Sequence, residues 1–243
     1  YKDVEVHQQD LCVLNEVKLE LQKGEFVYLI GKVGSGKTSL LKTFYGELDV
    51  ISGEAVVLGY DMNRIKRKHI PQLRRKLGIV FQDFQLLTDR TVNDNLAFVL
   101  KATGWKNKAE IKDRISEVLM QVGMGNKGYK FPNELSGGEQ QRIVIARAML
   151  NSPEIILADE PTGNLDAETG RAIVGLLHNI SRTGSLVVMT THNLQLLHEF
   201  PGQVYRCAGH QITDATSEYS GMMPIVEEIN NNIYSIQQKY YDA

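Results

Sequence analysis

The sequence predicts an α/β fold in which a parallel β-sheet carries an inserted helical subdomain. Two apolar runs, residues 25–30 and 155–158, are typical of strands that are buried on both faces of a parallel sheet. Between them, from about residue 86 to residue 150, the pattern changes from β-rich to helical. We therefore expect a single domain over residues 1–214, with the helical subdomain at about 86–150, followed by a C-terminal tail over 215–243.

Composition narrows the class of protein. The 243 residues are 42% hydrophobic and 23% charged, which is ordinary for a soluble globular protein. A net charge of −2 provides no bulk attraction to nucleic acid, so we expect no nucleic-acid partner. Cys12 and Cys207 are too few for a disulfide framework, and no apolar run approaches the roughly 18–20 residues of a membrane span. We expect a cytosolic protein whose membrane contact comes through a partner.

The remaining elements before residue 86 are predicted from local patterns. Residues 17–21 alternate between apolar and charged side chains, which predicts a half-buried strand, and residues 53–59 predict another strand bounded by glycines. The basic stretch at residues 64–76 fits either a surface that binds nucleic acid or anionic lipid, or a solvated helix leading into a strand at 77–81. We favour the solvated helix because no aromatic residues interleave with the charges.

Helical patterns follow in the insert and in the tail. Thr91 with Asp94 is typical of a helix N-terminus, and apolar residues at three- and four-residue intervals predict an amphipathic helix over 111–122 that ends at Gly123. The tail predicts a helix over residues 224–241 with an apolar stripe. This stripe packs either on the protein's own core, which we favour, or on a partner or second copy.

A glycine-rich loop lies between the first apolar strand and the next helix. It comprises Gly31, Lys32, Val33, Gly34, Ser35, Gly36, Lys37 and Thr38. Its glycines let the backbone wrap tightly, so that N–H groups and the following helix N-terminus point at one anion. This pattern predicts a phosphate-binding loop, with Lys37 placed for the β- and γ-phosphates and the Thr38 hydroxyl for Mg²⁺.

Two carboxylates end the second apolar strand. Ligands bind at the carboxyl ends of parallel strands, which places Asp159 and Glu160 near the phosphate loop. Asp159 suits the coordination shell of Mg²⁺, and Glu160 suits a general base that polarises an attacking water.

A second anion site is predicted within the helical part. Residues 135–142 place Ser136 and two glycines before a helix that opens at Glu139. One monomer does not need two γ-phosphate sites, so a second copy of the chain is the natural explanation.

Together these motifs are similar to those of the ATP-binding-cassette (ABC) ATPases, over nearly the whole chain up to about Thr213. Residues 135–140 resemble the signature motif of that family, and residues 155–160 resemble its Walker B strand. The resemblance implies a P-loop NTPase fold with a RecA-like parallel-sheet core, an antiparallel β subdomain and an inserted helical subdomain. It also implies hydrolysis of ATP to ADP and phosphate with Mg²⁺.

The resemblance assigns further residues. Gln82 resembles the glutamine that contacts Mg²⁺ and the attacking water, and His192 resembles the histidine that contacts the γ-phosphate. Ser136 and Gly138 would cover the ATP bound to Lys37 of a second copy, so that ATP binding makes a homodimer. The expected catalytic residues are Glu160, His192 and Gln82, and the expected metal ligands are Thr38, Gln82 and Asp159. Asp166 is expected in a loop that lies across the dimer interface. The expected nucleotide-binding residues are Gly31, Lys32, Val33, Gly34, Ser35, Gly36, Lys37, Thr38, Ser39, His7, Ser136, Gly138 and Asp166.

Two positions depart from the family pattern. Val33 stands where many relatives have serine, so one hydroxyl near the phosphates is missing and backbone donors are expected to compensate. The aromatic residue that stacks on adenine in the family falls near His7, whose imidazole stacks more weakly, and Tyr1 is farther away. We expect a competent ATPase with modest nucleotide affinity.

Residues 81–97 resemble the cell-division branch of the family. That resemblance implies an integral membrane partner of the FtsX type, a location on the inner face of the bacterial cell membrane, and regulation of peptidoglycan hydrolysis. The alternative within the family is the ATPase of a lipoprotein-releasing or macrolide- or peptide-export system. Soluble ABC proteins of DNA repair or translation form another class, but the chromosome-type members carry a long coiled coil that is missing here, and this chain has a single cassette. A module that binds ATP without turnover is disfavoured by the presence of Gln82, Glu160 and His192.

Overall fold

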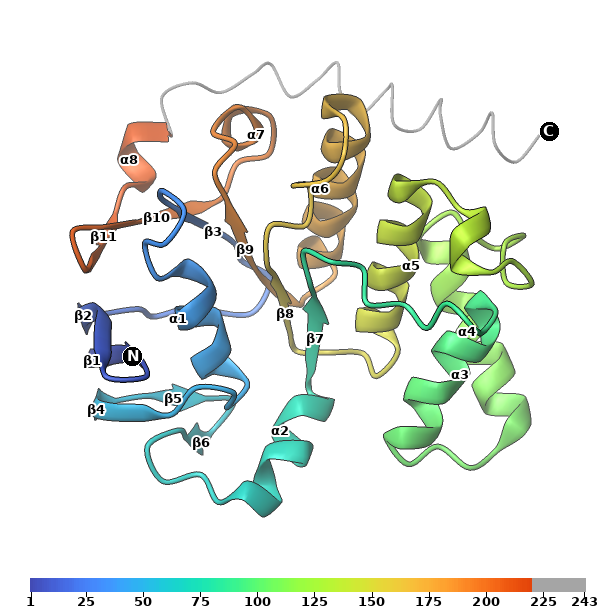
Figure 1. Cartoon of the computed structure of the whole chain (residues 1–243), viewed down its shortest axis with the longest axis horizontal. Coiled ribbons are helices and arrows are strands. Elements are labelled where there is room, and N and C mark those ends of the chain that lie inside the picture. Colours follow the sequence, from blue (N-terminus) through green and yellow to red (C-terminus); the bar gives the residue numbers. More distant parts are fainter. Residues whose placement is uncertain (220–243) are drawn as a thin grey trace.

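The computed structural model describes residues 1–219 and has the predicted α/β architecture (Figure 1). Its strands are β1 (Lys2–Gln8), β2 (Leu11–Val17), β3 (Phe26–Ile30), β4 (Val50–Glu54), β5 (Val56–Val57), β6 (Tyr60–Asp61), β7 (Leu77–Val80), β8 (Ile155–Ala158), β9 (Leu186–Thr191), β10 (Gln203–Ala208) and β11 (Gln211–Asp214). Its helices are α1 (Lys37–Phe44), η1 (Arg67–His69), α2 (Ile70–Arg75), α3 (Val92–Ala102), α4 (Lys108–Gln121), η2 (Pro132–Glu134), α5 (Gly137–Met149), α6 (Ala167–Arg182), α7 (Gln195–Glu199) and α8 (Thr216–Tyr219). The helix expected at residues 224–241 lies outside the described residues.

The core is a six-stranded sheet with the order β11-β10-β3-β9-β8-β7. The five strands from β10 to β7 are parallel, and only β11 runs antiparallel, against β10. Strand β9 therefore lies between β3 and β8, although it follows both of them in the sequence. This order brings the loops after β3, β9, β8 and β7 to one edge of the sheet.

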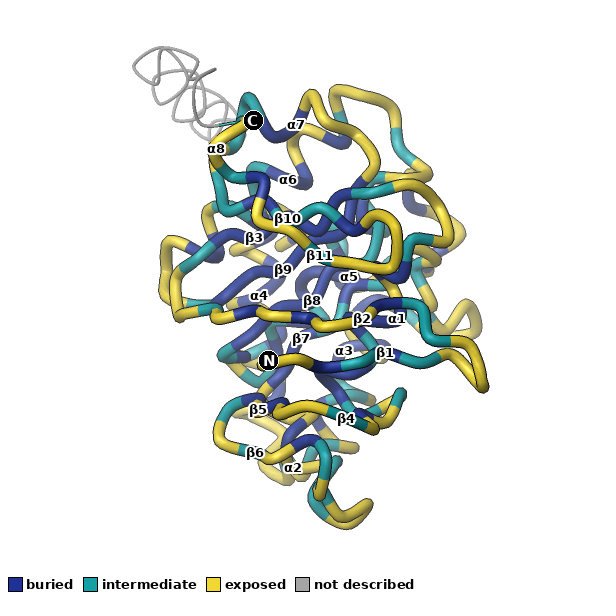
Figure 2. Tube along the Cα trace, turned by 90° about the vertical axis from the view of Figure 1, so that its left-hand side faces the viewer, coloured by how far each residue is buried: buried dark blue, intermediate teal, exposed yellow. Residues whose placement is uncertain are grey.

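Both faces of the core sheet are covered, as the continuous apolar strands predict. Successive side chains of a strand point to opposite faces, so β3 places Phe26, Tyr28 and Ile30 in one hydrophobic cluster and Val27 and Leu29 in another. The first cluster packs against α3–α6, and the second packs against α1, α2 and the antiparallel strands. Figure 2 shows these buried strands between more exposed outer elements.

The antiparallel subdomain differs in detail from the local predictions. Strands β2, β1 and β4 form one sheet in that order, and β5 pairs with β6 in another. The predicted strand at 17–21 is wrong in extent, because β2 ends at Val17; side-chain burial still alternates to Leu21, and Leu19 exchanges two backbone hydrogen bonds with Tyr1. The single strand predicted at 53–59 is also wrong. Gly53, with φ +73°, belongs to β4, where a Cβ would lie 2.3 Å from the Asp3 carbonyl oxygen.

The region expected to be helical, residues 86–150, contains α3, α4 and α5, which lie on the right in Figure 1. The Thr91 hydroxyl caps α3 by accepting a hydrogen bond from the Asp94 N–H, at 3.2 Å. Helix α4 ends at Gln121, and Gly123 follows in a left-handed conformation with φ +72°.

The basic stretch forms η1 and α2, a surface helix that leads into β7 as predicted. Only Leu73 of α2 is buried, so the arginines around it remain on the surface. Within residues 1–219 no helix combines the length and the apolar character that a membrane crossing requires.

Replacing Ile156 with alanine tests the packing of the core. Ile156 lies in the interior strand β8 and is 0% exposed, so its truncation leaves a cavity and should lower the free energy of unfolding by about 2–5 kcal/mol. Urea titration measures the change. Ile51→Ala is the matched control, because Ile51 is 67% exposed on β4, and its substitution should cost less than about 0.5 kcal/mol. Equal losses in the two variants would contradict the assigned core.

Candidate active site

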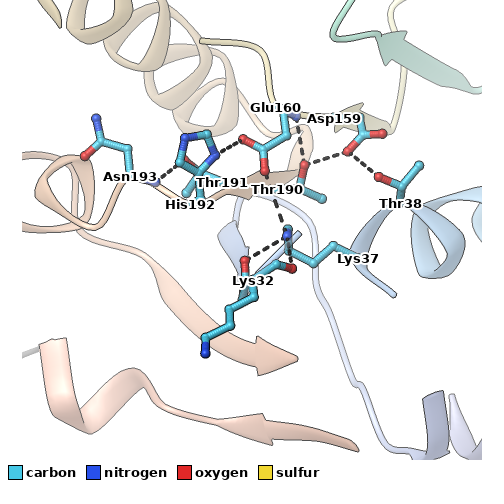
Figure 3. Close-up of polar contacts among 10 residues, drawn as sticks. Lys32, Lys37, Thr38, Asp159, Glu160, Thr190, Thr191, His192 and Asn193 are labelled. Carbon is cyan, nitrogen blue, oxygen red and sulfur yellow. Dashed lines mark hydrogen bonds and ion pairs between the residues drawn. The ribbon is translucent and has the colours of Figure 1, made fainter. Parts of the chain in front are cut away.

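The candidate site lies where four neighbouring parallel strands end. The glycine-rich loop follows β3, Thr190 and His192 lie at the end of β9, Asp159 and Glu160 follow β8, and Gln82 follows β7. Figure 3 shows that the side chains from the first three strands converge on one small volume. The strand order, rather than proximity along the chain, assembles this group.

The glycine-rich loop is wrapped around the side chain of Lys37. Nζ of Lys37 donates hydrogen bonds to the carbonyl oxygens of Gly31, at 2.8 Å, and Lys32, at 3.0 Å, and the residue is only 6% exposed. A Cβ on Gly31 would lie 2.4 Å from the Cys207 carbonyl oxygen, and Gly36 begins α1 with φ +93°. These positions therefore require glycine, and the lysine is held in place before any ligand binds.

A chain of hydroxyls and carboxylates joins the loop to β8 and β9. Oδ1 of Asp159 accepts hydrogen bonds from the Thr38 hydroxyl, at 3.0 Å, and from the Thr190 hydroxyl, at 2.7 Å. The Thr190 hydroxyl in turn accepts the backbone N–H of Glu160, at 2.8 Å. One buried threonine thus fixes both the side chain of Asp159 and the backbone at Glu160.

Glu160 lies between two basic groups. Its Oε2 accepts a hydrogen bond from Nδ1 of His192, at 2.9 Å, and its Oε1 lies 3.9 Å from Nζ of Lys37 (Figure 3). The Glu160 side chain is 14% exposed, whereas that of His192 is 63% exposed. Glu160 also has φ +44°, a left-handed conformation that non-glycine residues rarely adopt and that is concentrated at functional sites.

The residues present fit a phosphate group and a hard divalent cation. A cavity of about 190 Å³ opens beside the loop and is lined by Ser35, Lys37 and Thr38 among others. The Ser35 hydroxyl is buried and has no hydrogen-bond partner among the described residues, which marks a polar atom available to a ligand. The Thr38 and Asp159 oxygens, 3.0 Å apart, are the kind of ligand that Mg²⁺ prefers.

The Gln82 side chain lies near the end of β8, the strand that precedes Asp159 and Glu160. Its backbone carbonyl accepts a hydrogen bond from Nδ2 of Asn164, at 3.4 Å. A Cβ placed on Gly163 would lie 3.5 Å from Nε2 of Gln82 and 3.4 Å from the Glu160 carbonyl oxygen. Gln82 is therefore next to the turn that follows Glu160, and it is exposed.

Ser136, Gly138 and Asp166 form a separate group at the N-termini of α5 and α6. The Ser136 hydroxyl accepts the Glu139 N–H, at 3.3 Å, and the Glu139 carboxylate accepts the Ser136 N–H, at 2.9 Å. A Cβ on Gly138 would lie 2.4 Å from Cγ2 of Thr169, so the two helix ends are in direct contact. Within residues 1–219 no hydrogen bond or ion pair joins this group to the glycine-rich loop.

The carboxylates of Glu139 and Asp166 cap the N-termini of α5 and α6. The backbone N–H of Ser136, helped by Lys127, holds the pKa of Glu139 below its usual value. The hydroxyl and N–H of Thr169 hold the pKa of Asp166 below its usual value in the same way. Both side chains are therefore ionised at neutral pH and occupied within their own helices.

The two positions that depart from the family pattern have distinct surroundings. Val33 is 92% exposed at the tip of the loop, so its side chain faces solvent. Nε2 of His7 lies 3.0 Å from a carboxylate oxygen of Glu5, whereas its neighbour Gln8, together with Val13, lines the cavity beside the loop. The expected stacking of His7 on adenine stays a prediction.

Thr190 is the residue that the sequence analysis missed. It is 0% exposed near the end of β9, after four apolar residues and two residues before His192. A hydroxyl at the carboxyl end of a buried parallel strand is a usable signal, because a buried polar group needs partners and those partners lie at the ligand-binding edge.

A lysine fixed over a phosphate loop, with an Mg²⁺-type ligand pair and a carboxylate held against a histidine, is the arrangement of a P-loop ATPase. Comparison with known proteins agrees. A family model described as ABC transporter matches residues 14–163. The cell division ATP-binding protein FtsE of Streptococcus pneumoniae (strain D39) is 43% identical over 195 residues, which cover 80% of this chain and 84% of that protein. The cell division ATP-binding protein FtsE of Escherichia coli (strain K12) is 44% identical over 184 residues, which cover 76% of this chain and 82% of that protein.

Among solved structures, a dimeric ATP-binding cassette in a post-hydrolysis state with ADP and Pi superposes with a TM-score of 0.76 at 31% identity. The superposition covers 87% of this chain and 94% of the other. The chain belongs to the ABC transporter family. It is an ATP-hydrolysing nucleotide-binding subunit of that family.

Replacing Thr190 with valine tests the junction between β8 and β9. Valine keeps the volume but leaves the Glu160 N–H and Asp159 Oδ1 each without one partner, so ATPase kcat should fall roughly 10- to 100-fold. Steady-state phosphate release measures the change. Thr191→Val is the matched control, because the hydroxyl of this buried neighbour accepts only the Asn193 N–H and touches neither carboxylate. A Thr190→Val rate within twofold of the wild type would contradict the role of Thr190.

Proposed function

We propose that the glycine-rich loop binds the phosphates of ATP and that Thr38 and Asp159 hold Mg²⁺. The support is geometric: Lys37 is already held over the loop, and the two oxygen ligands lie 3.0 Å apart. The bound metal would neutralise charge that develops on the phosphate oxygens. Lys32, Val33 and Ser39 take part through their place in and beside the loop, and Gln82 completes the metal shell.

Glu160 is the general base of this proposal. Its carboxylate is held by His192 on one oxygen and faces Lys37 on the other, which orients it to accept a proton from water. His192 positions Glu160 and contacts the γ-phosphate. The Glu160–His192 hydrogen bond is the single observation that carries the assignment.

The complete site is proposed to form between two copies of the chain. Ser136, Gly138 and Asp166 make no hydrogen bond to the loop within the described part of one chain, and their helix N-termini suit an anion from elsewhere. A solved relative is a dimer in its post-hydrolysis state. ATP would then close a homodimer in which each chain covers the nucleotide on the other.

The biological role that we propose is regulation of peptidoglycan hydrolysis during bacterial cell division. The support is the 43–44% identity to the FtsE proteins over most of the chain. An FtsX-type integral membrane protein would be the partner, and this chain would lie on the inner face of the cell membrane. Residues 1–214 would form the ATPase domain, and the tail over 215–243 would follow it.

Affinity purification of the tagged chain from detergent-solubilised native membranes, with mass spectrometry, tests this role. Enrichment of an FtsX-type protein is the expected result. Enrichment of a lipoprotein-release or export permease instead would overturn the cell-division role while leaving the ATPase assignments intact.

Glu160→Gln should lower the rate of ATP hydrolysis by roughly 100-fold or more, because the amide cannot accept the proton from water. ATP affinity should stay close to wild type, since Lys37 and the loop are unchanged. Single-turnover hydrolysis and nucleotide titration measure the two quantities. Glu20→Gln, on the exposed surface, is the control. A loss below tenfold in Glu160→Gln would assign the general base elsewhere.

Ser136→Arg should leave ATP binding to the isolated chain intact and abolish turnover, because a bulky cation would occupy the dimer interface. Removal of the cap costs about 1 kcal/mol, so circular dichroism checks that the variant is folded. Ser217→Arg, at an exposed position of α8, is the matched control and should keep wild-type turnover. An unaffected rate in Ser136→Arg would contradict the shared site.

A further inference from the structure

A group of metal-ligating side chains lies on the hairpin formed by β1 and β2, apart from the carboxylates at the ends of the core strands, and it includes His7, the residue expected to stack on adenine. Within residues 1–219, Glu5, His7 and Cys12 are the one group of three or more such residues whose ligand atoms all lie within 4.8 Å of one another. Nε2 of His7 and Oε2 of Glu5 are 3.0 Å apart, and Sγ of Cys12 donates to the Leu14 carbonyl oxygen at 3.3 Å. All three residues are partly exposed.

Strand geometry places the three side chains on one face. Val4 and Val6 are buried, whereas Glu5 and His7 are partly exposed on the outer face. The register with β2 shifts between Val6 and His7, so that Val6 opposes Leu14 and His7 opposes Cys12. Cys12 is paired directly with His7 across the antiparallel ladder, and opposed residues share a face. Backbone pairing therefore places His7 beside Cys12, and Glu5 lies two residues before His7 on the same strand.

The donor set indicates the metal. A thiolate, an imidazole and a carboxylate are ligands that Zn²⁺ accepts together, whereas Mg²⁺ and Ca²⁺ prefer oxygen alone. In a tetrahedral zinc site with bonds of about 2.0–2.3 Å, the ligand atoms lie roughly 3.3–3.8 Å apart, so small side-chain rotations close the present separations. We propose that Glu5, His7 and Cys12 bind one Zn²⁺, with water as the fourth ligand.

Binding would exchange local hydrogen bonds for metal bonds. The Cys12 thiol would release its proton to solvent and lose its hydrogen bond to Leu14, and the His7–Glu5 hydrogen bond would be replaced by coordination of both groups. The metal would clip β1 to β2 across the hairpin. Gln8 and Val13, each one residue from a ligand, line the cavity beside the phosphate loop, so the clip would fix one wall of that cavity.

Cobalt substitution in the nucleotide-free full chain tests the site, because a Co²⁺–thiolate bond gives a near-ultraviolet charge-transfer band. Wild-type protein should show the band at one Co²⁺ per chain, and Zn²⁺ should displace it. Cys12→Ser should remove the band and weaken Zn²⁺ binding roughly tenfold or more. Cys207→Ala is the control: this second thiol is buried in β10, and its loss should leave the band unchanged.

Hydrogen exchange provides a second readout that does not depend on ATP hydrolysis. Zn²⁺ should slow amide exchange over residues 5–13 in wild-type protein and in Cys207→Ala, and not in Cys12→Ser. Absence of the cobalt band in wild-type protein, or a band that survives Cys12→Ser, would overturn the proposal. If Glu160→Gln failed to slow hydrolysis, the proposed zinc site would be unaffected. The proposed ATPase mechanism and the proposed zinc site are therefore tested independently.

Discussion

The position of β9 between β3 and β8 is the constraint on which the active site depends. Thr190, near the end of β9, accepts from the Glu160 backbone and donates to Asp159, and Thr38 from the neighbouring loop donates to the same Asp159 oxygen. A different strand order would separate these groups by at least one strand spacing of about 4.8 Å. The geometry of the candidate site is thus a consequence of sheet topology, because the packing of both apolar faces of the sheet fixes the positions of the strands.

Within this frame the active site is built from groups that are already positioned. Lys37 is held by two loop carbonyls, Glu160 by His192, and the backbone at Glu160 by a buried hydroxyl. Phosphoryl transfer depends mainly on positioning and on electrostatic stabilisation, so pre-ordered charges lower the barrier without reorganisation at the moment of reaction. In the proposed dimer, the capped ends of α5 and α6 of a second copy cover the open side of the nucleotide.

Much of the fold and of the candidate site was predictable from the sequence, because each motif has local physical requirements that restrict its residues. The glycine-rich loop requires positive φ and close approach at Gly31 and Gly36, and the apolar strand before Asp159 requires burial on both faces. Such demands leave strong local patterns. Thr190 was missed because its partners Glu160 and Asp159 are 30 and 31 residues away in the sequence, and only the strand order brings them together.

The two incorrect strand predictions, at residues 17–21 and 53–59, also result from tertiary contacts that local sequence patterns do not contain. Side-chain burial does alternate over residues 17–21, but beyond Val17 backbone pairing is limited to that of Leu19 with Tyr1, so β2 ends at Val17. The glycine at position 53 suggests a strand boundary, but Gly53 lies within β4, where the backbone of Asp3 comes too close to leave room for a Cβ. Cys12 lies beside His7 only through the register of β1 with β2, so spacing along the sequence gives no indication that it could be a ligand.

Mixing two inactive variants tests whether the ATPase site is shared between two chains. Glu160→Gln and Ser136→Arg chains both retain the phosphate loop, and each homodimer has two defective sites. If each site takes its loop from one chain and Ser136 from the other, a mixed dimer contains one intact site, and the equimolar mixture should recover up to about a quarter of wild-type ATPase activity. A mixture no more active than its separate components would contradict a site shared between two chains.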